Sequence, residues 1–187
     1  MNPEDRNPFD EQYATEIMVL GIGCIFYSDE GFGVRVVEKM EKHYEFPENV
    51  LLVDGGVLGI NLLGVISKPK HLIVMDAIRN RGKPGDLYRL DGDAIPARIR
   101  AKNSLHQVDF LEALTLCQAL DHVPQTVIIG VEPQDIDSQS LDLTPVVQAR
   151  VDPVIEMVLA ELERLGVSYR KGKSENVSCN PIQNNPH

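Results

Sequence analysis

Three side chains that can bind a metal or move a proton lie beside apolar segments of this chain. Glu30 follows the apolar run Ile17–Gly23, Asp76 ends the run His71–Met75, and His106 precedes an apolar helical pattern. Two carboxylates and an imidazole form a mixed oxygen and nitrogen set, which suits a borderline divalent ion such as zinc or nickel. Spacing alone does not join the three residues, because no local motif such as H-E-x-x-H contains them.

Several of the neighbouring polar residues also have simpler interpretations. Aspartate is a favoured helix cap, so Asp76 fits a capping role as well as a chemical one. Asp54 precedes the pair Gly55–Gly56, a pattern typical of a turn. His43 and His122 have no comparable partners, and we interpret both as surface histidines.

The glycine turn after the first apolar run argues against a dinucleotide site. A phosphate-binding turn has the pattern G-x-G-x-x-G, but after Gly21 and Gly23 this chain carries Phe26 at the third small position. Asp29 and Glu30 would also repel a pyrophosphate at the start of the next helix, where the helix dipole favours anions. The same dipole favours an ionised Glu30, which is then available to a cation.

Cys24 lies in this turn and offers a rival chemistry. A cysteine in a strand-to-helix turn can be activated by a histidine, so a hydrolase that uses Cys24 and His106 is an alternative. A small cysteine packed under the turn is the simpler interpretation. The other two cysteines, Cys117 and Cys179, are distant in sequence and form no C-x-x-C pair. We therefore expect a reduced, cytoplasmic protein.

Strand and helix patterns alternate along the chain and predict a scaffold for these residues. The predicted strands span residues 17–23, 50–53, 71–75 and 126–129, with an edge strand at 86–90, and the predicted helices cover 34–44, 60–66, 110–116 and 147–165. The run Leu72–Met75 shows no alternation, which indicates burial on both faces, as in a parallel sheet. The expected fold is α/β, a single-domain doubly wound, mostly parallel twisted sheet with helices on both faces.

In such a sheet, ligands bind outside the carboxyl ends of the strands. Glu30, Asp54 and Asp76 all follow or end predicted strands, so we expect them at this edge. We predict a flexible leader at residues 1–16, the folded domain at 17–166 and a disordered tail at 167–187.

Composition excludes some classes of partner. The chain has 187 residues and a net charge of -10, and its sequence pI is about 4.9. Long-range repulsion therefore opposes binding to nucleic acid and to anionic membranes. The sequence shows neither a signal-peptide pattern nor an apolar run long enough to span a bilayer. We expect no nucleic acid and no membrane among its partners.

Six short segments between Ile17 and Gly166 follow one another in a characteristic order. They are Leu20-Gly-Ile-Gly23, Ser28-Asp-Glu-Gly-Phe-Gly-Val34, Asp54-Gly-Gly56, Leu62-Leu-Gly64, His71-Leu-Ile-Val-Met-Asp-Ala77 and Ser104-Leu-His-Gln107. Together they resemble the nickel-iron hydrogenase maturation proteases. The second and last segments are similar to the branch that serves membrane-bound uptake hydrogenases.

The resemblance implies an endopeptidase, in a family classed as aspartyl-type, that removes a C-terminal extension from the hydrogenase large-subunit precursor after nickel insertion. Glu30, Asp76 and His106 match the family's three nickel-contacting residues, so Glu30 and Asp76 are also catalytic candidates. Asp54 is the candidate general base. The nickel is expected to come with the substrate, held by substrate cysteines, and zinc or cadmium are expected to fit the same site. The expected partner is the nickel-loaded precursor, and we expect a monomer.

Two positions depart from the family pattern. Cys24 stands where the family usually has asparagine, and Val57 stands where threonine usually follows Asp-Gly-Gly. Both replacements remove a hydrogen-bonding side chain beside the expected cleft, but the three proposed ligands are retained. Two other functions stay open at this point. One is a metal-checking chaperone that leaves the precursor intact, and the other is the Cys24-dependent hydrolase.

Overall fold

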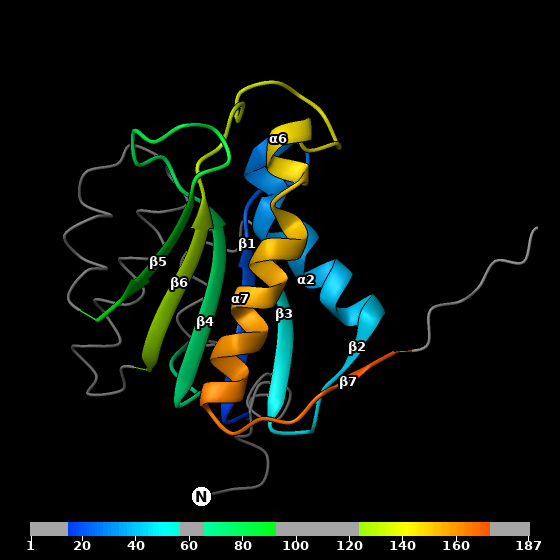
Figure 1. Cartoon of the computed structure of the whole chain (residues 1–187), viewed down its shortest axis with the longest axis vertical. Helices are drawn as coiled ribbons and strands as arrows, with labels where there is room; N and C mark the ends of the chain where they lie inside the picture. Colours follow the sequence, from blue (N-terminus) through cyan, green and yellow to red (C-terminus); the bar gives the residue numbers. More distant parts are fainter. Residues whose placement is uncertain (1–14, 57–65, 93–123, 173–187) are drawn as a thin grey trace, which may run out of the picture.

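The computed structural model describes residues 15–56, 66–92 and 124–172 (Figure 1). Its elements are β1 (Ile17–Ile22), the 3-10 helix η2 (Ser28–Gly31), α2 (Phe32–His43), β2 (Tyr44–Glu45), β3 (Val50–Gly56), β4 (His71–Ala77), β5 (Leu87–Asp91), β6 (Gln125–Val131), α6 (Pro145–Gln148), α7 (Val151–Arg164) and β7 (Arg170–Lys171). The predicted strands are confirmed, as are the helices at 34–44 and 147–165, the second as two pieces. Residues 60–65 and 110–116 of the other predicted helices lie outside the described residues.

The main sheet has the strand order β3-β1-β4-β6-β5. The first four strands are parallel, and β5 runs antiparallel to β6 at the edge, as the sequence predicts for residues 86–90. From β1 the chain goes to β3 on one side and then to β4 on the other. The junction of β1 and β4 is therefore the switch point of the sheet, where α/β proteins usually bind ligands.

Both faces of this sheet are buried. Helices α2 and α7 cover one face (Figure 1), where Phe32 and Val154 join Ile73 in one apolar cluster. On the other face Leu20 and Val74 belong to a second buried cluster. Burial on both faces explains why β4 has no polar alternation. The expected α/β fold, a mostly parallel sheet flanked by helices, is confirmed.

Glycines bring the start of α2 directly onto the carboxyl ends of β1 and β4. A Cβ atom on Gly33 would overlap the carbonyl oxygen of Met75 and lie 2.7 Å from the backbone nitrogen of Ile22. A Cβ atom on Gly21 would overlap the carbonyl oxygen of Gly33. Because the obstructing atoms are backbone atoms, only glycine permits this close approach. The approach sets η2, which directly precedes α2, at the switch point.

The folded part continues past Gly166. Val167 is buried, and β7 pairs with β2 in a small antiparallel sheet. The ring of Tyr169 also packs beside the ring of Tyr44, with centroids 5.8 Å apart. Residues 167–172, which were predicted to belong to the tail, are therefore part of the fold, and the predicted disorder of residues 173–187 lies outside the described residues. The residues around Val167 and Tyr169 are mostly polar, so the sequence alone does not indicate that these two side chains pack against the fold.

No helix in the described ranges is both long enough and apolar enough to cross a bilayer.

Candidate active site at the carboxyl edge of the sheet

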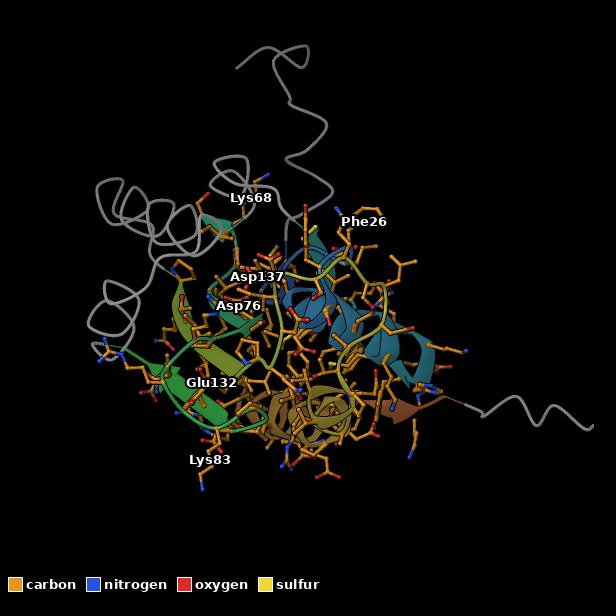
Figure 2. The ribbon with its side chains drawn as sticks, turned by 90° about the horizontal axis from the view of Figure 1, so that it is seen from above. Phe26, Lys68, Asp76, Lys83, Glu132 and Asp137 are labelled. Atoms are coloured by element: carbon orange, nitrogen blue, oxygen red, sulfur yellow. The ribbon has the colours of Figure 1, made fainter. Side chains whose placement is uncertain are left out.

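Glu30 and Asp76 both lie at the switch point. Asp76 is the next-to-last residue of β4 and is half-buried, and Figure 2 shows it from above at this end of the sheet. Glu30 is half-buried in η2, which packs against β4. Gly23 has a φ of 131°, and a Cβ atom there would overlap the carbonyl oxygen of Glu30. The glycine turn therefore lets the backbone of Glu30 lie over the end of β1.

His106, the third predicted ligand, belongs to residues 93–123, outside the described residues. In the described part of the chain, no group of three His, Cys, Asp or Glu side chains is arranged to hold a metal ion. The structure thus brings two of the three predicted ligands to one edge, and the place of His106 stays a prediction. Val57, the second departure from the family pattern, also lies outside the described residues.

Asp54 lies at the same edge but is separated from Asp76 by β1. Its register partner in β1 is Gly21, which in turn lies opposite Met75. Side chains alternate along a strand, so Asp54 and Met75 share one face of the sheet and Asp76 belongs to the other. Asp54 is exposed, and its Oδ1 accepts a hydrogen bond of 2.9 Å from the backbone N–H of Gly56. The structure therefore gives Asp54 a turn role, and a role as general base stays a prediction.

Cys24 follows β1 in the glycine turn. Its thiol is free and half-buried, and its carbonyl oxygen accepts a hydrogen bond of 3.2 Å from the backbone N–H of Tyr27. Nothing in this environment tests the pairing of Cys24 with His106.

Asp29, next to Glu30, is the organising carboxylate of this edge. It is fully buried, and its Oδ2 accepts hydrogen bonds of 2.9 Å from the backbone N–H groups of Gln134 and Asp135. Its Oδ1 accepts a 2.7 Å bond from the backbone N–H of Thr144, whose hydroxyl lies 2.9 Å from both carboxylate oxygens. These bonds offset the cost of burying the carboxylate. Asp29 thereby fastens the segment after β6 beside η2.

A second buried carboxylate, Glu132, fastens the loop between β4 and β5. Its Oε2 accepts hydrogen bonds from the backbone N–H groups of Asn80 at 2.7 Å and Gly82 at 3.1 Å. The hydroxyl of Tyr88 donates a third bond of 2.6 Å to the same oxygen. Desolvation and this hydrogen bond to Glu132 raise the pKa of Tyr88 to about 12. The shift favours the neutral phenol, so Tyr88 keeps its proton and donates this hydrogen bond to Glu132 through the physiological pH range.

Sequence reasoning missed the roles of Asp29 and Glu132. The sequence indicates only that Asp29 is a charge near a helix start, and no local pattern points to Glu132. Neither could be found from local patterns, because the partners of Asp29 lie more than a hundred residues away in sequence. The one available indication was an acidic residue next to an apolar strand, and this signal does not separate a structural carboxylate from a catalytic one.

Large apolar side chains are exposed on two neighbouring loops at this edge. Phe26 and Tyr27 belong to the turn after β1, and Leu141 belongs to the segment after β6. The loops are joined by backbone bonds, because Ser140 donates to the Phe26 carbonyl at 3.0 Å and Ser28 donates to the Ser140 carbonyl at 2.9 Å. Figure 2 shows Phe26 on the outside of this end of the molecule. Exposed apolar groups beside carboxylates suit a site that receives a polypeptide.

Several known proteins are similar to this chain. The family model for hydrogenase maturation protease matches residues 34–161. A hydrogenase expression/formation protein HupD of Thiocapsa roseopersicina is 40% identical over 164 residues, which cover 87% of this chain and 74% of the relative. The hydrogenase 2 maturation protease of Escherichia coli is 37% identical over 153 residues, covering 81% of this chain and 93% of the relative.

The solved structure of the hydrogenase maturating endopeptidase HybD from Escherichia coli shares the fold. It superposes with a TM-score of 0.80 at 36% identity and covers 84% of this chain and 98% of its own. The HupD relative supports the predicted similarity to the uptake branch. With a mostly parallel sheet, carboxylates at its switch point and these matches, the chain belongs to the hydrogenase maturation protease family and is a peptidase of that family.

Proposed function

We propose that this protein cleaves the C-terminal extension from a nickel-iron hydrogenase large-subunit precursor, and that it recognises the precursor by the nickel already inserted. The observation that carries the proposal is the placement of Glu30 and Asp76 at one switch point, where close glycine packing fixes η2 against the ends of β1 and β4. Two carboxylates at the mouth of a sheet can add oxygen ligands to a divalent ion that the substrate brings.

Glu30, Asp76 and His106 are the proposed contacts to the substrate's nickel. Carboxylates bind a cation in their ionised form, and a neutral histidine nitrogen completes a mixed ligand set of the kind nickel accepts. A precursor without nickel offers no cation to these groups and so lacks this contact. Recognition of loaded substrate follows from this difference. Zinc or cadmium would fit the same donor set.

Peptide hydrolysis needs an attacking water and two proton transfers. Nickel held near the scissile bond can polarise its carbonyl or lower the pKa of a bound water. A carboxylate accepts the proton from the water as the water oxygen attacks the carbonyl carbon, and the proton then passes to the leaving amine. Glu30 and Asp76 are the carboxylates at the switch point that can serve here. Asp54 is retained as a third candidate, with the Gly56 turn as its competing role.

The site also suits an extended polypeptide as substrate. The exposed side chains of Phe26, Tyr27 and Leu141 offer apolar contacts next to η2.

The proposed place of action is the cytoplasm, where precursor and protease meet before assembly, and the proposed working form is a monomer. The location follows from the cysteine pattern, which predicts a reduced protein, and the monomer follows from the expected role of a protease that binds its substrate transiently.

Two further functions use the same site and remain candidates. A chaperone that only checks for nickel would bind the loaded precursor through Glu30 and Asp76 and leave the chain intact. A hydrolase that uses Cys24 is supported by the placement of this half-buried thiol in the turn after β1. Cys24→Ala separates it from the favoured proposal, because a metal-assisted protease keeps its rate when the thiol is removed.

The variants Glu30→Gln, Asp76→Asn and His106→Ala test the ligand assignment. Each is expected to keep the thermal unfolding midpoint of the wild type within a few degrees and to lose processing of nickel-loaded precursor. Asp142→Asn is the matched control, because it removes one exposed carboxylate from the same edge. If one of the three ligand variants processes the precursor at the control rate, that residue is not a required ligand.

A further inference from the structure

A cationic loop follows β4 at the same edge as Asp76. The loop spans residues 79–85 and exposes Arg79, Arg81 and Lys83, although the whole chain has a net charge of -10. Figure 2 shows Lys83 at the outer rim of this end of the molecule, with Glu132 between it and Asp76 in the view. We call residues 79–85 the cationic loop.

The cationic loop is held in one conformation from beneath. The side chain of buried Glu132 accepts hydrogen bonds from the backbone N–H groups of Asn80 and Gly82. The backbone carbonyl of Glu132 accepts a further hydrogen bond of 2.8 Å from the N–H of Gly85. A Cβ atom on Gly82 would overlap the hydroxyl oxygen of Tyr88. Arg81 adopts a φ of 60°, a left-handed conformation that a non-glycine residue keeps only when its surroundings impose it.

Only one of the three cationic side chains of this loop forms an ion pair in the described part of the chain. Arg79 pairs with Asp137 at 3.3 Å, an exposed contact. Within the described ranges, the side chains of Arg81 and Lys83 have neither a hydrogen bond nor an ion pair. The carboxylate of Asp86 binds the backbone N–H of Lys83 at 2.7 Å, so it stabilises the turn. Two cations are thus presented to solvent on a prearranged backbone.

We propose that the cationic loop binds an acidic segment of the hydrogenase large-subunit precursor and so sets the orientation in which the precursor meets Glu30 and Asp76. This inference rests on the proposed function and adds a second recognition element to it. A strongly acidic protein repels an acidic segment over most of its surface. A local pair of cations therefore favours the one orientation in which the acidic segment of the precursor lies beside the cationic loop. A prearranged loop also loses little conformational entropy when it binds.

The test compares two double variants with equal changes in net charge. Arg81→Asn/Lys83→Gln neutralises the loop, and asparagine suits the left-handed backbone at position 81, so the loop keeps its conformation. The matched control, Arg170→Gln/Lys171→Gln, neutralises two exposed cations of β7, near the opposite end of the sheet (Figure 1). The steady-state kinetics of nickel-loaded precursor cleavage are measured for both variants and the wild type over a series of salt concentrations.

The loop variant is expected to raise KM roughly threefold to tenfold at low salt, the range of two exposed ion pairs, with kcat unchanged. The increase should shrink at high salt, where the wild type loses the same attraction. An unchanged KM, an equal increase in the control, or a fall in kcat alone would overturn the proposal. If the wild type cleaves nothing, equilibrium binding of the same nickel-loaded precursor is compared between the variants. In that event the proposed function fails, while the role of the loop is still decided by the dissociation constants.

Discussion

Replacing Asp29 by asparagine tests whether this buried carboxylate organises the edge that carries Glu30. The change keeps the size and shape of the side chain but removes its charge and one acceptor oxygen. In the wild type, every hydrogen bond to Asp29 from Gln134, Asp135 and Thr144 is donated to the carboxylate. An amide nitrogen in either oxygen position therefore faces a donor.

The expected cost follows from the cheaper of the two amide orientations. With the amide nitrogen at the Oδ2 position, the N–H groups of both Gln134 and Asp135 lose their acceptor. With the amide nitrogen at the Oδ1 position, only the backbone N–H of Thr144 loses its acceptor, because the Thr144 hydroxyl can rotate and accept a hydrogen bond from the amide. Loss of one charge-assisted bond to a buried donor costs about 2–3 kcal/mol. The unfolding midpoint should then fall by roughly 5–10 °C.

Chemical denaturation measures this loss of unfolding free energy, and native-state hydrogen exchange locates it. The amides of Gln134, Asp135 and Thr144 should exchange faster in Asp29→Asn, while the amides of β4 change only as far as global stability does. Asp142→Asn removes one exposed carboxylate from the same segment, and it should change stability by no more than about 0.5 kcal/mol. A loss in Asp29→Asn no larger than in this control would refute the assigned role of Asp29.

Three more predictions concern the site and its scaffold. Asp54→Asn keeps an oxygen that can accept the hydrogen bond from Gly56, but the amide cannot act as a base. A kcat reduced by about 100-fold or more would identify Asp54 as the general base. A near wild-type kcat would leave Asp54 only its role in the turn. The hydrogen bond from Arg89 lowers the pKa of Glu161 below its ordinary value of 4.5. The stability that this ion pair contributes is therefore present above pH 4.5 and is lost as the pH falls through the lower pKa of the folded state. The unfolding free energy should drop more steeply below pH 4.5 in the wild type than in Glu161→Gln, and parallel curves would contradict this. Gly33→Ala forces a Cβ onto backbone atoms of β1 and β4 and should cost about 3 kcal/mol, measured by urea denaturation; a loss below about 1 kcal/mol, the ordinary effect of a tolerated substitution, would show that α2 can shift.

The strands were predictable because their signals are local. The run from His71 to Met75 is apolar without alternation, and the structure buries it in the centre of a parallel sheet. The edge strand at residues 86–90 was also predictable from its composition. The predicted tail began too early, because Val167 and Tyr169 are single apolar residues in a polar stretch. Val167 joins the larger apolar cluster, and the ring of Tyr169 packs beside Tyr44 of β2, which lies far away in sequence.

The site was predictable only in part. Glu30 and Asp76 follow predicted strands, and the rule for parallel sheets places such residues at one edge. The buried carboxylates Asp29 and Glu132 needed the tertiary structure, because their hydrogen-bond partners come from other strands and loops. Asp54 was correctly placed at the edge. Its separation from Asp76 by β1, however, depends on strand order, which local patterns do not contain.

The measurement that tests the central claim most directly is intact mass spectrometry of a hydrogenase large-subunit precursor incubated with this protein. Nickel-loaded and nickel-free precursor are compared under the same conditions, with Asp76→Asn as the inactive control. The account predicts a single loss of a C-terminal fragment, seen only with nickel-loaded precursor and wild-type protein. Cleavage that ignores nickel would contradict recognition of the metal, and stable binding without any change in mass would support the chaperone instead.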